Sequence, residues 1–339
     1  MPKHLNPNRS NQIRKELSTE AYVEGILNGD RSVLARAITL IESRKAQNRK
    51  QAEDIIEECL PHSGNSFRLG ITGVPGVGKS SFIESFGTQI IQNDHKLAVL
   101  AIDPSSEKSR GSILGDKTRM EKLSNNENAF IRPSPASDAL GGVARKTRES
   151  IILCEAAGYD YIIVETVGVG QSETAVLSMV DFFLLLLLPG AGDELQGIKR
   201  GIVEMADMIA INKADGDKID AAKQAKIEYK NALHLYPPNE KGWDVPVNLC
   251  SALYGDGISE IIEQLDHYSK SMKEKALFDK LREKQNQYWL IESLNESLQI
   301  EFYNHPEIVK RLTEYRSEVS SGKISPFKAA EELIKIFKN

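Results

Sequence analysis

The chain has 339 residues, of which 40% are hydrophobic and 27% charged, so it can bury one substantial core and add a helical appendage. Its formal net charge of −5 provides no basic surplus for nucleic acid or anionic lipid, and we expect neither partner. The longest strongly apolar run, residues 182–188, is far shorter than the roughly 20 residues needed to cross a bilayer, so we expect no membrane span.

Three segments with different patterns follow one another along the chain. Residues 1–62 predict an N-terminal helical extension, in which Asp30 can cap a helix that begins at Arg31. Residues 63–265 alternate strand and helix, which predicts an α/β domain with a mostly parallel sheet flanked by helices. Residues 266–339 are charged and helix-prone, and they predict a C-terminal helical extension. The apolar positions expected to pack in the first segment are Tyr22, Ile26, Leu34, Ile38 and Ile41.

The run from Gly73 to Ser80 fits the phosphate-binding pattern G-x-x-x-x-G-K-[ST], between an apolar β-prone segment and a helical one. In such a loop the backbone N–H groups surround the phosphates, Lys79 reaches the β- and γ-phosphates, and the Ser80 hydroxyl binds Mg²⁺. A glycine-rich turn is the alternative, but strand, loop and helix agree on a nucleotide site. The nucleotide-binding residues assigned here are Gly73, Gly76, Val77, Gly78, Lys79, Ser80 and Ser81.

Two acidic residues follow the next predicted strand, residues 97–102. Asp103 stands at the carboxyl end of that strand, and Asp116 lies in a polar, glycine-containing loop long enough to fold over a nucleotide. We assign both to the metal. The alternatives are a turn cap for Asp103 and a solvated loop charge for Asp116.

The segment 161–165 reads as a buried strand and is followed by Thr166-Val167-Gly168, so that Glu165-Thr-Val-Gly168 is similar to the D-x-x-G switch of GTPases with Glu in place of Asp. Glu165 can reach Mg²⁺ through water, and the Gly168 N–H can approach a γ-phosphate because no side chain blocks it. Val169 occupies the position at which Ras-like proteins keep a water-orienting Gln. Gln171 is two positions further on, so it is not assigned that role.

Residues 182–188 predict a central strand covered on both faces, followed by the glycine-rich loop 189–200. The acidic and basic residues of that loop suit a moving element. Lys199 or Arg200 can stabilise charge in a transition state, although an exposed, solvated cation is the alternative.

Asn212-Lys213-Ala-Asp215 follows another apolar run, 208–211, at the carboxyl end of a predicted parallel strand. Asp215 can accept two hydrogen bonds from guanine N1–H and N2–H₂, which adenine does not offer, while Asn212 braces the loops and the Lys213 stem lies along the base. A further strand, 245–251, leads into Ser251, Ala252 and Leu253, where GTPases place a backbone N–H against the guanine oxygen. These motifs, in this order, predict a GTP site.

In the C-terminal segment four apolar residues recur at helical spacing: Leu290, Ile291, Leu294 and Leu298. They predict a packing stripe, with Trp289 at its edge, either in the core or in a dimer. Pro306 and the stretch from Gly322 to Pro326 interrupt the helical pattern.

Taken together, these motifs resemble the methylmalonyl-CoA mutase-associated GTPases of the MeaB/ArgK/MMAA type, across about residues 20–270. The most specific segments are Asp103-Pro-Ser-Ser106 and Glu165-Thr-Val-Gly-Val-Gly-Gln171. The others are Gly73–Ser80, Gly111–Met120, Pro189–Asp193 and Asn212–Asp215.

The resemblance implies a P-loop GTPase fold, slow GTP hydrolysis with Mg²⁺, and a homodimer to which a C-terminal helical arm contributes. It also implies a chaperone of adenosylcobalamin-dependent methylmalonyl-CoA mutase, which gates cofactor loading and protects the enzyme. By the same resemblance Lys79, Asp116, Glu165 and Lys199 serve hydrolysis. Ser80, Asp103, Asp116 and Glu165 belong to the metal sphere, and Asp193 and Gln171 belong to switch segments, with Lys199 beside Asp193.

Several alternatives stay open. A nickel-delivery GTPase of similar fold ought to show a Cys-His cluster, but the six histidines are scattered. An ATP-using kinase would carry a kinase catalytic loop, which is missing here. GTP can also be a purely structural ligand, and the client can be a related acyl-CoA mutase.

The cysteines and the N-terminus bear on the compartment. Cys59, Cys154 and Cys250 are widely separated and form no C-x-x-C pair, which indicates buried thiols in a reducing compartment. The first residues lack the apolar stretch of a secretory signal, so we expect a cytoplasmic protein.

Overall fold

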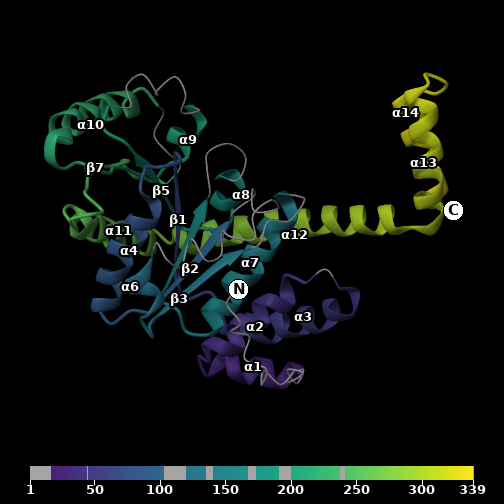
Figure 1. Cartoon of the computed structure of the whole chain (residues 1–339), viewed down its shortest axis with the longest axis horizontal. Coiled ribbons are helices and arrows are strands. Elements are labelled where there is room, and N and C mark those ends of the chain that lie inside the picture. The colour runs from purple at the N-terminus through teal and green to yellow at the C-terminus, as the bar shows by residue number, and fades with distance from the viewer. Residues whose placement is uncertain are drawn as a thin grey trace, which may run out of the picture.

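The computed structural model describes residues 17–43, 45–102, 120–134, 140–166, 173–190, 200–236 and 241–338. Within these ranges seven strands form one parallel sheet, in the order β3-β2-β4-β1-β5-β6-β7 (Figure 1). The strands are β1 (Phe67–Gly73), β2 (Leu97–Ile102), β3 (Ala129–Ser134), β4 (Tyr161–Thr166), β5 (Phe182–Leu187), β6 (Met208–Ile211) and β7 (Val247–Leu249). This architecture confirms the predicted α/β fold with a mostly parallel sheet.

Helices cover both faces of the sheet, because its central strands are apolar on both sides. In β5, Phe182, Leu184 and Leu186 pack into one hydrophobic cluster, and the residues between them pack into the other. The first cluster includes residues of α4 (Lys79–Gln92), α6 (Glu121–Ser124) and α11 (Ile258–Glu274). The second includes residues of α7 (Leu140–Ala156), α8 (Glu173–Leu177), α9 (Arg200–Met205) and α10 (Ile219–Leu233).

The N-terminal extension packs against this second side. It consists of α1 (Thr19–Leu27), α2 (Arg31–Ile41) and α3 (Ala46–Cys59), followed by the short 3₁₀ turn Leu60–His62. Asp30 caps α2 as expected, since its carboxylate accepts hydrogen bonds from the N–H groups of Ser32 (2.8 Å) and Val33 (3.1 Å). The five apolar residues predicted to pack are all buried.

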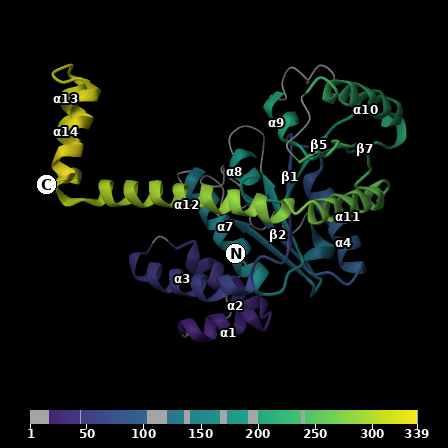
Figure 2. The ribbon, with the colours of Figure 1, turned by 180° about the vertical axis from the view of Figure 1, so that it is seen from behind.

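The C-terminal extension is an arm that leaves the body of the molecule. α12 (Leu277–Asn304) starts beside α11 and projects outward, and α13 (Pro306–Ser320) and α14 (Pro326–Lys338) stand at its far end (Figures 1 and 2). The expected boundary between residues 265 and 266 lies within α11, whose buried residues as far as Met272 belong to the first cluster.

The predicted packing stripe on α12 is not part of this chain's core. Leu290, Ile291, Leu294 and Leu298 are 49–68% exposed, whereas Trp289, expected at the edge, is 9% exposed and joins the second cluster. The core interpretation of the stripe is therefore wrong for the isolated chain.

The other predicted strands agree with the structure to different extents. β2 and β6 have the expected bounds, but the strand expected over 245–251 is shortened to the three residues of β7. The edge strand β3 was not predicted. Its sequence, Ala-Phe-Ile-Arg-Pro-Ser, contains a charge and a proline, and both are tolerated because only one edge of β3 pairs in the described sheet.

Candidate functional site

The phosphate-binding pattern lies where β1 ends and α4 begins, at the carboxyl edge of the sheet. Gly73 has φ 155°, and an added Cβ would lie 2.6 Å from the Leu186 carbonyl oxygen; Gly78 caps α4 in the left-handed region with φ 96°. Because only glycine fits both positions, the loop can turn sharply and direct the first N–H groups of α4 to its concave side.

Lys79 folds back onto this loop. Its Nζ donates to the carbonyl oxygens of Gly73 (2.7 Å) and Val74 (3.4 Å). Burial lowers the pKa of Lys79, and the nearby Glu165 carboxylate opposes that shift by favouring the charged ammonium. The cation and the acid at the end of β4 therefore face the same space.

The carboxylate of Glu165 lies beside the loop because β4 pairs with β1. Glu165 is the register partner of Ile71 and is 6% exposed, and Ser80 is half-buried on the first turn of α4. A hydroxyl and a carboxylate are ligand types that Mg²⁺ prefers, so this pair fits a metal at the loop.

The residue after Glu165 gives a support that the sequence analysis missed. The Thr166 hydroxyl donates to the Thr72 hydroxyl (2.8 Å), and both side chains are fully buried. This bond joins the end of β4 to the last residue before the glycine loop. In the sequence, Thr72 and Thr166 each follow an apolar strand segment. This shared placement is the signal that could have revealed the hydrogen bond between them.

The segment 212–215 contacts the loop directly. Asn212 Nδ2 donates to the Val77 carbonyl oxygen (2.8 Å), and Lys213 Nζ donates to the Gly76 carbonyl oxygen (2.7 Å). Lys213 has φ 59°, which points its stem back over the loop. These contacts join residues 135 and 137 positions apart in the sequence, so the two motifs form one surface.

The loop after β7 completes this surface. The Ala252 N–H donates to Asn212 Oδ1 (3.0 Å), and the Ser251 hydroxyl lies 2.5 Å from Asp215 Oδ2. This hydrogen bond fixes the orientation of the Asp215 carboxylate. Leu253 and its neighbour Tyr254, which was not singled out from the sequence, are 77% and 69% exposed beside this site.

Six of the predicted site residues lie outside the described ranges: Asp103, Asp116, Gly168, Gln171, Asp193 and Lys199. The structure brings together the others, which come from the glycine loop, the end of β4, the segment after β6 and the loop after β7.

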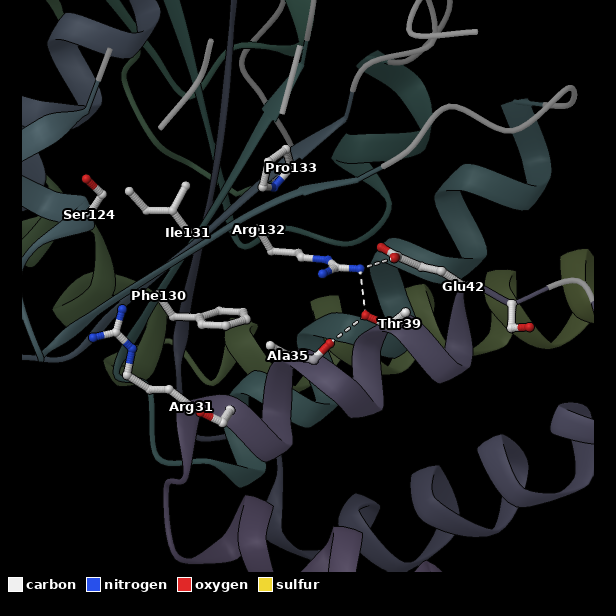
Figure 3. A pocket seen from close by; sticks show the side chains of 11 residues that line it. Arg31, Ala35, Thr39, Glu42, Ser124, Phe130, Ile131, Arg132 and Pro133 are labelled. Atoms are coloured by element: carbon white, nitrogen blue, oxygen red, sulfur yellow. Dashed lines mark hydrogen bonds and ion pairs between the residues drawn. The ribbon is translucent and has the colours of Figure 1, made fainter. Parts of the chain in front are cut away.

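A cavity of about 850 Å³ lies elsewhere, between α2 and the edge strand β3 (Figure 3). Arg132 of β3 points across it toward α2, where it pairs with Glu42 and donates to the Thr39 hydroxyl (3.2 Å). Two strands, β2 and β4, lie between β3 and β1, so the cavity is distinct from the nucleotide surface. Its polar groups hold the N-terminal extension to the sheet.

Two features are absent from the described part of the chain. No helix there is long and apolar enough to cross a membrane. No group of three or more His, Cys, Asp or Glu side chains there is arranged to hold a metal ion.

Comparison with known proteins agrees with this geometry. The family model described as methylmalonyl Co-A mutase-associated GTPase MeaB matches residues 34–307. A Mus musculus protein named methylmalonic aciduria type A homolog, mitochondrial, is 46% identical over 325 residues, which cover 93% of this chain and 78% of that protein. GTPase ArgK of Escherichia coli is 42% identical over 311 residues, covering 92% of this chain and 94% of that protein.

A solved structure is similar over nearly the whole chain. The crystal structure of a protein named LAO/AO transport system kinase has a TM-score of 0.73 and 34% sequence identity, and the match covers 95% of this chain and 98% of that one. The family model spans well over half of the chain, and the fold is that of a P-loop GTPase. The chain belongs to the methylmalonyl-CoA mutase-associated GTPase family, and its activity is the hydrolysis of GTP.

Proposed function

We propose that GTP binds with its phosphates in the glycine loop and its guanine against the segment 212–215. The observation that carries this proposal is the pair of hydrogen bonds from Asn212 and Lys213 to the carbonyl oxygens of Val77 and Gly76. They hold the base-recognition segment at a fixed place relative to the phosphate loop. Asp215 selects guanine, the backbone of Ser251, Ala252 and Leu253 faces the guanine oxygen, and the N–H groups from Gly73 to Ser81 contact phosphate.

Hydrolysis uses the same loop. Lys79 and the loop N–H groups stabilise the charge that develops on the phosphates, and Gly168 contacts the γ-phosphate. Ser80 and Glu165, with Asp103 and Asp116, would hold Mg²⁺, which adds positive charge at the phosphates when it is bound. Lys199 is the candidate for a further cation. Since Val169 replaces a water-orienting Gln, we expect slow turnover by the chain alone.

The client that we propose is adenosylcobalamin-dependent methylmalonyl-CoA mutase. Family membership and the name of the mouse relative support this choice. In this proposal the nucleotide state, communicated by switch residues such as Gln171 and Asp193, gates cofactor loading and protects the mutase. The second candidate function is that of a chaperone for a related acyl-CoA mutase or of a metallochaperone-like GTPase. Identifying the captured client distinguishes these functions from the first.

We further propose that the chain divides at about residues 62 and 265 into extension, GTPase domain and arm, and that the arm forms a homodimer. The exposed apolar residues of α12 and an apolar groove of about 900 Å³ between α12, α13 and α14 support a partner for the arm. A cytoplasmic location is supported by three cysteines that are all buried free thiols.

The test of the client is capture of the mutase by the tagged full-length chain loaded with GDP or with a non-hydrolysable GTP analogue. We expect retention of methylmalonyl-CoA mutase that differs between the two nucleotides. Calorimetry with GTP and GDP in the presence of Mg²⁺ is done first, since binding heat establishes the site independently of any client. Retention of no cobalamin enzyme in either state would refute the chaperone role while leaving the GTP site in place.

A further inference from the structure

The strands β1 and β4 part at the carboxyl edge of the sheet, where the glycine loop begins. Their register with each other ends at the pair Ile71–Glu165. Beyond that pair, Thr72 and Gly73 continue the register of β1 with β5, and Thr166 continues that of β4 with β2. The end of β4 and the start of the loop are therefore held by different neighbouring strands.

A side-chain hydrogen bond spans the point where the two strands part. The Thr166 hydroxyl donates to the Thr72 hydroxyl (2.8 Å), and both side chains are fully buried. In register these residues would form the pair that follows Ile71–Glu165, so the bond extends the contact between the strands by one residue. It fixes their separation there, because a buried hydroxyl that loses its partner cannot replace it with water.

The threonine hydroxyls and the Glu165 carboxylate lie on opposite faces of the sheet, because side chains alternate along a strand. Thr166 shares the face of Val164, whose side chain belongs to the second cluster. Glu165 shares the face of Ile163 in the first cluster, which is the side of α4 and Ser80. The threonine bond therefore lies behind the proposed metal ligands and does not itself form part of the nucleotide surface.

We propose that Thr72 and Thr166 are positioning residues for Mg²⁺, because their bond holds the end of β4, and with it the Glu165 carboxylate, at a fixed distance from the glycine loop. This role rests on the proposed binding of Mg²⁺ by Ser80 and Glu165, and it adds the device that keeps the two ligands together. Neither threonine is a metal ligand.

The consequence is a split between two parts of nucleotide binding. The loop keeps its place without the threonine bond, because Gly73 packs so closely on β5 that an added Cβ would lie 2.6 Å from the Leu186 carbonyl oxygen. Lys79 also stays bonded to the Gly73 carbonyl oxygen (2.7 Å). Binding of GDP without metal depends on this loop and should be unchanged. The further affinity that Mg²⁺ provides depends on Glu165 and should fall.

The test compares alanine with serine at each threonine of the full-length chain. Both replacements remove the γ-methyl group, but only serine keeps the hydroxyl. The affinity for a fluorescent GDP analogue is measured in EDTA and at a series of Mg²⁺ concentrations. For Thr72→Ala and Thr166→Ala we expect the affinity in EDTA to stay within about twofold of wild type, and the half-saturating Mg²⁺ concentration to rise about threefold to tenfold. The serine variants should keep both values within about twofold of wild type.

Two further variants separate positioning from loss of stability. In the double variant Thr72→Ala, Thr166→Ala, the half-saturating Mg²⁺ concentration should be no higher than in the more affected single variant, because both changes remove the same bond. Ile162→Val shortens a fully buried side chain earlier in β4, and we expect a lower Tm with unchanged Mg²⁺ dependence. Tm is measured for every variant, and one alanine variant that folds is sufficient for the test.

Alanine variants with the Mg²⁺ dependence of wild type would overturn the proposal, and so would serine variants, or Ile162→Val, that lose as much Mg²⁺ affinity as the alanine variants do. The wild-type chain is measured first. If its affinity for GDP does not respond to Mg²⁺, the assignment of Ser80 and Glu165 to the metal is refuted, and this role falls with it. If it binds no GDP, the nucleotide site itself is refuted, so the three failures are distinguishable.

Discussion

Lys79 is held in place by the loop that it serves. Its ammonium donates to the carbonyl oxygens of Gly73 and Val74, so a nucleotide entering the loop meets a preformed cation that is hydrogen-bonded to neutral acceptors. Phosphate oxygens are stronger acceptors for that charge, and the interaction strengthens as negative charge develops during hydrolysis.

We therefore expect Lys79→Ala to lower kcat/KM for GTP by about 10² to 10³-fold, measured by phosphate release. Lys96→Ala is the matched control, since Lys96 is an exposed lysine at the opposite edge of the sheet. A variant at Lys79 that keeps wild-type turnover would remove the assignment of this loop to phosphate.

Ser251, 2.5 Å away, orients the carboxylate of Asp215, the residue that we propose selects guanine. Asp215→Asn replaces an acceptor by a donor at the guanine N2 position. We expect GTP affinity to fall about 10- to 100-fold, because hydrogen bonds to a charged group are lost, and XTP affinity to rise. Competition binding of GTP, XTP and ATP measures this exchange. The exposed Asp217→Asn, two residues on, should leave all three affinities as they are.

At the scale of elements, a buried ion network ties the start of β1 to α7. Arg68 donates to both carboxylate oxygens of Glu155 (2.8 and 2.9 Å), and the Ser66 hydroxyl also donates to Glu155 (2.6 Å). Burial alone raises the pKa of Glu155, but the hydrogen bonds and charge of Arg68 outweigh it, so the net pKa lies below its usual 4.5.

This depressed pKa gives a prediction about pH. The folded protein holds Glu155 ionised more strongly than the unfolded chain does, so the stabilisation is complete above the unfolded pKa and is lost as pH falls below about 4.5. At pH 7 we expect Glu155→Gln to lose about 3–5 kcal/mol of unfolding free energy, since Arg68 keeps a buried charge without its carboxylate. Urea unfolding from pH 7 to pH 3.5 should show that difference shrinking.

The control is Glu53→Gln, which breaks a pair with Arg49 in which both side chains are 50% exposed. An exposed pair contributes only about 0–1 kcal/mol, so this variant should differ little from wild type at any pH. A difference between wild type and Glu155→Gln that stays constant across the pH range would contradict the linkage to Glu155.

For the whole molecule, the arm leaves more apolar surface exposed than a monomer needs. Four large side chains on α12 are 49–68% exposed, although the same helix buries Trp289. We expect the chain to sediment at twice 37.7 kDa and the double variant Leu290→Asp, Leu294→Asp to sediment as a monomer, because charges at a buried interface lose their hydration.

Sedimentation equilibrium at several concentrations measures this association. Glu301→Lys, an exposed charge change on the same helix, is the control and should remain dimeric. A wild-type chain that sediments at 37.7 kDa would contradict the dimer, and the apolar face of the arm would then require another partner.

The sequence by itself determined the fold class, the strands β2 and β6, the cap of α2 and the identity of the family. Each of these depends on local information. The information is a glycine spacing typical of phosphate-binding loops, a continuous apolar run, or a carboxylate placed just before a helix. The motif residues from Gly73 to Ser80 and from Asn212 to Asp215 could be found in the same way, because their spacing is short and their backbone requirements are strict.

Only the tertiary structure decided what lies between those motifs. It placed Lys213 on the carbonyl oxygen of Gly76, linked Thr166 to Thr72, exposed the stripe on α12 and buried Trp289 against the turn after α8. The physical reason is that a helical spacing tells which residues share a face, whereas the direction of that face depends on partners far away in the chain. For α12 those partners are carbonyl oxygens more than 100 residues earlier, and no local pattern identifies them.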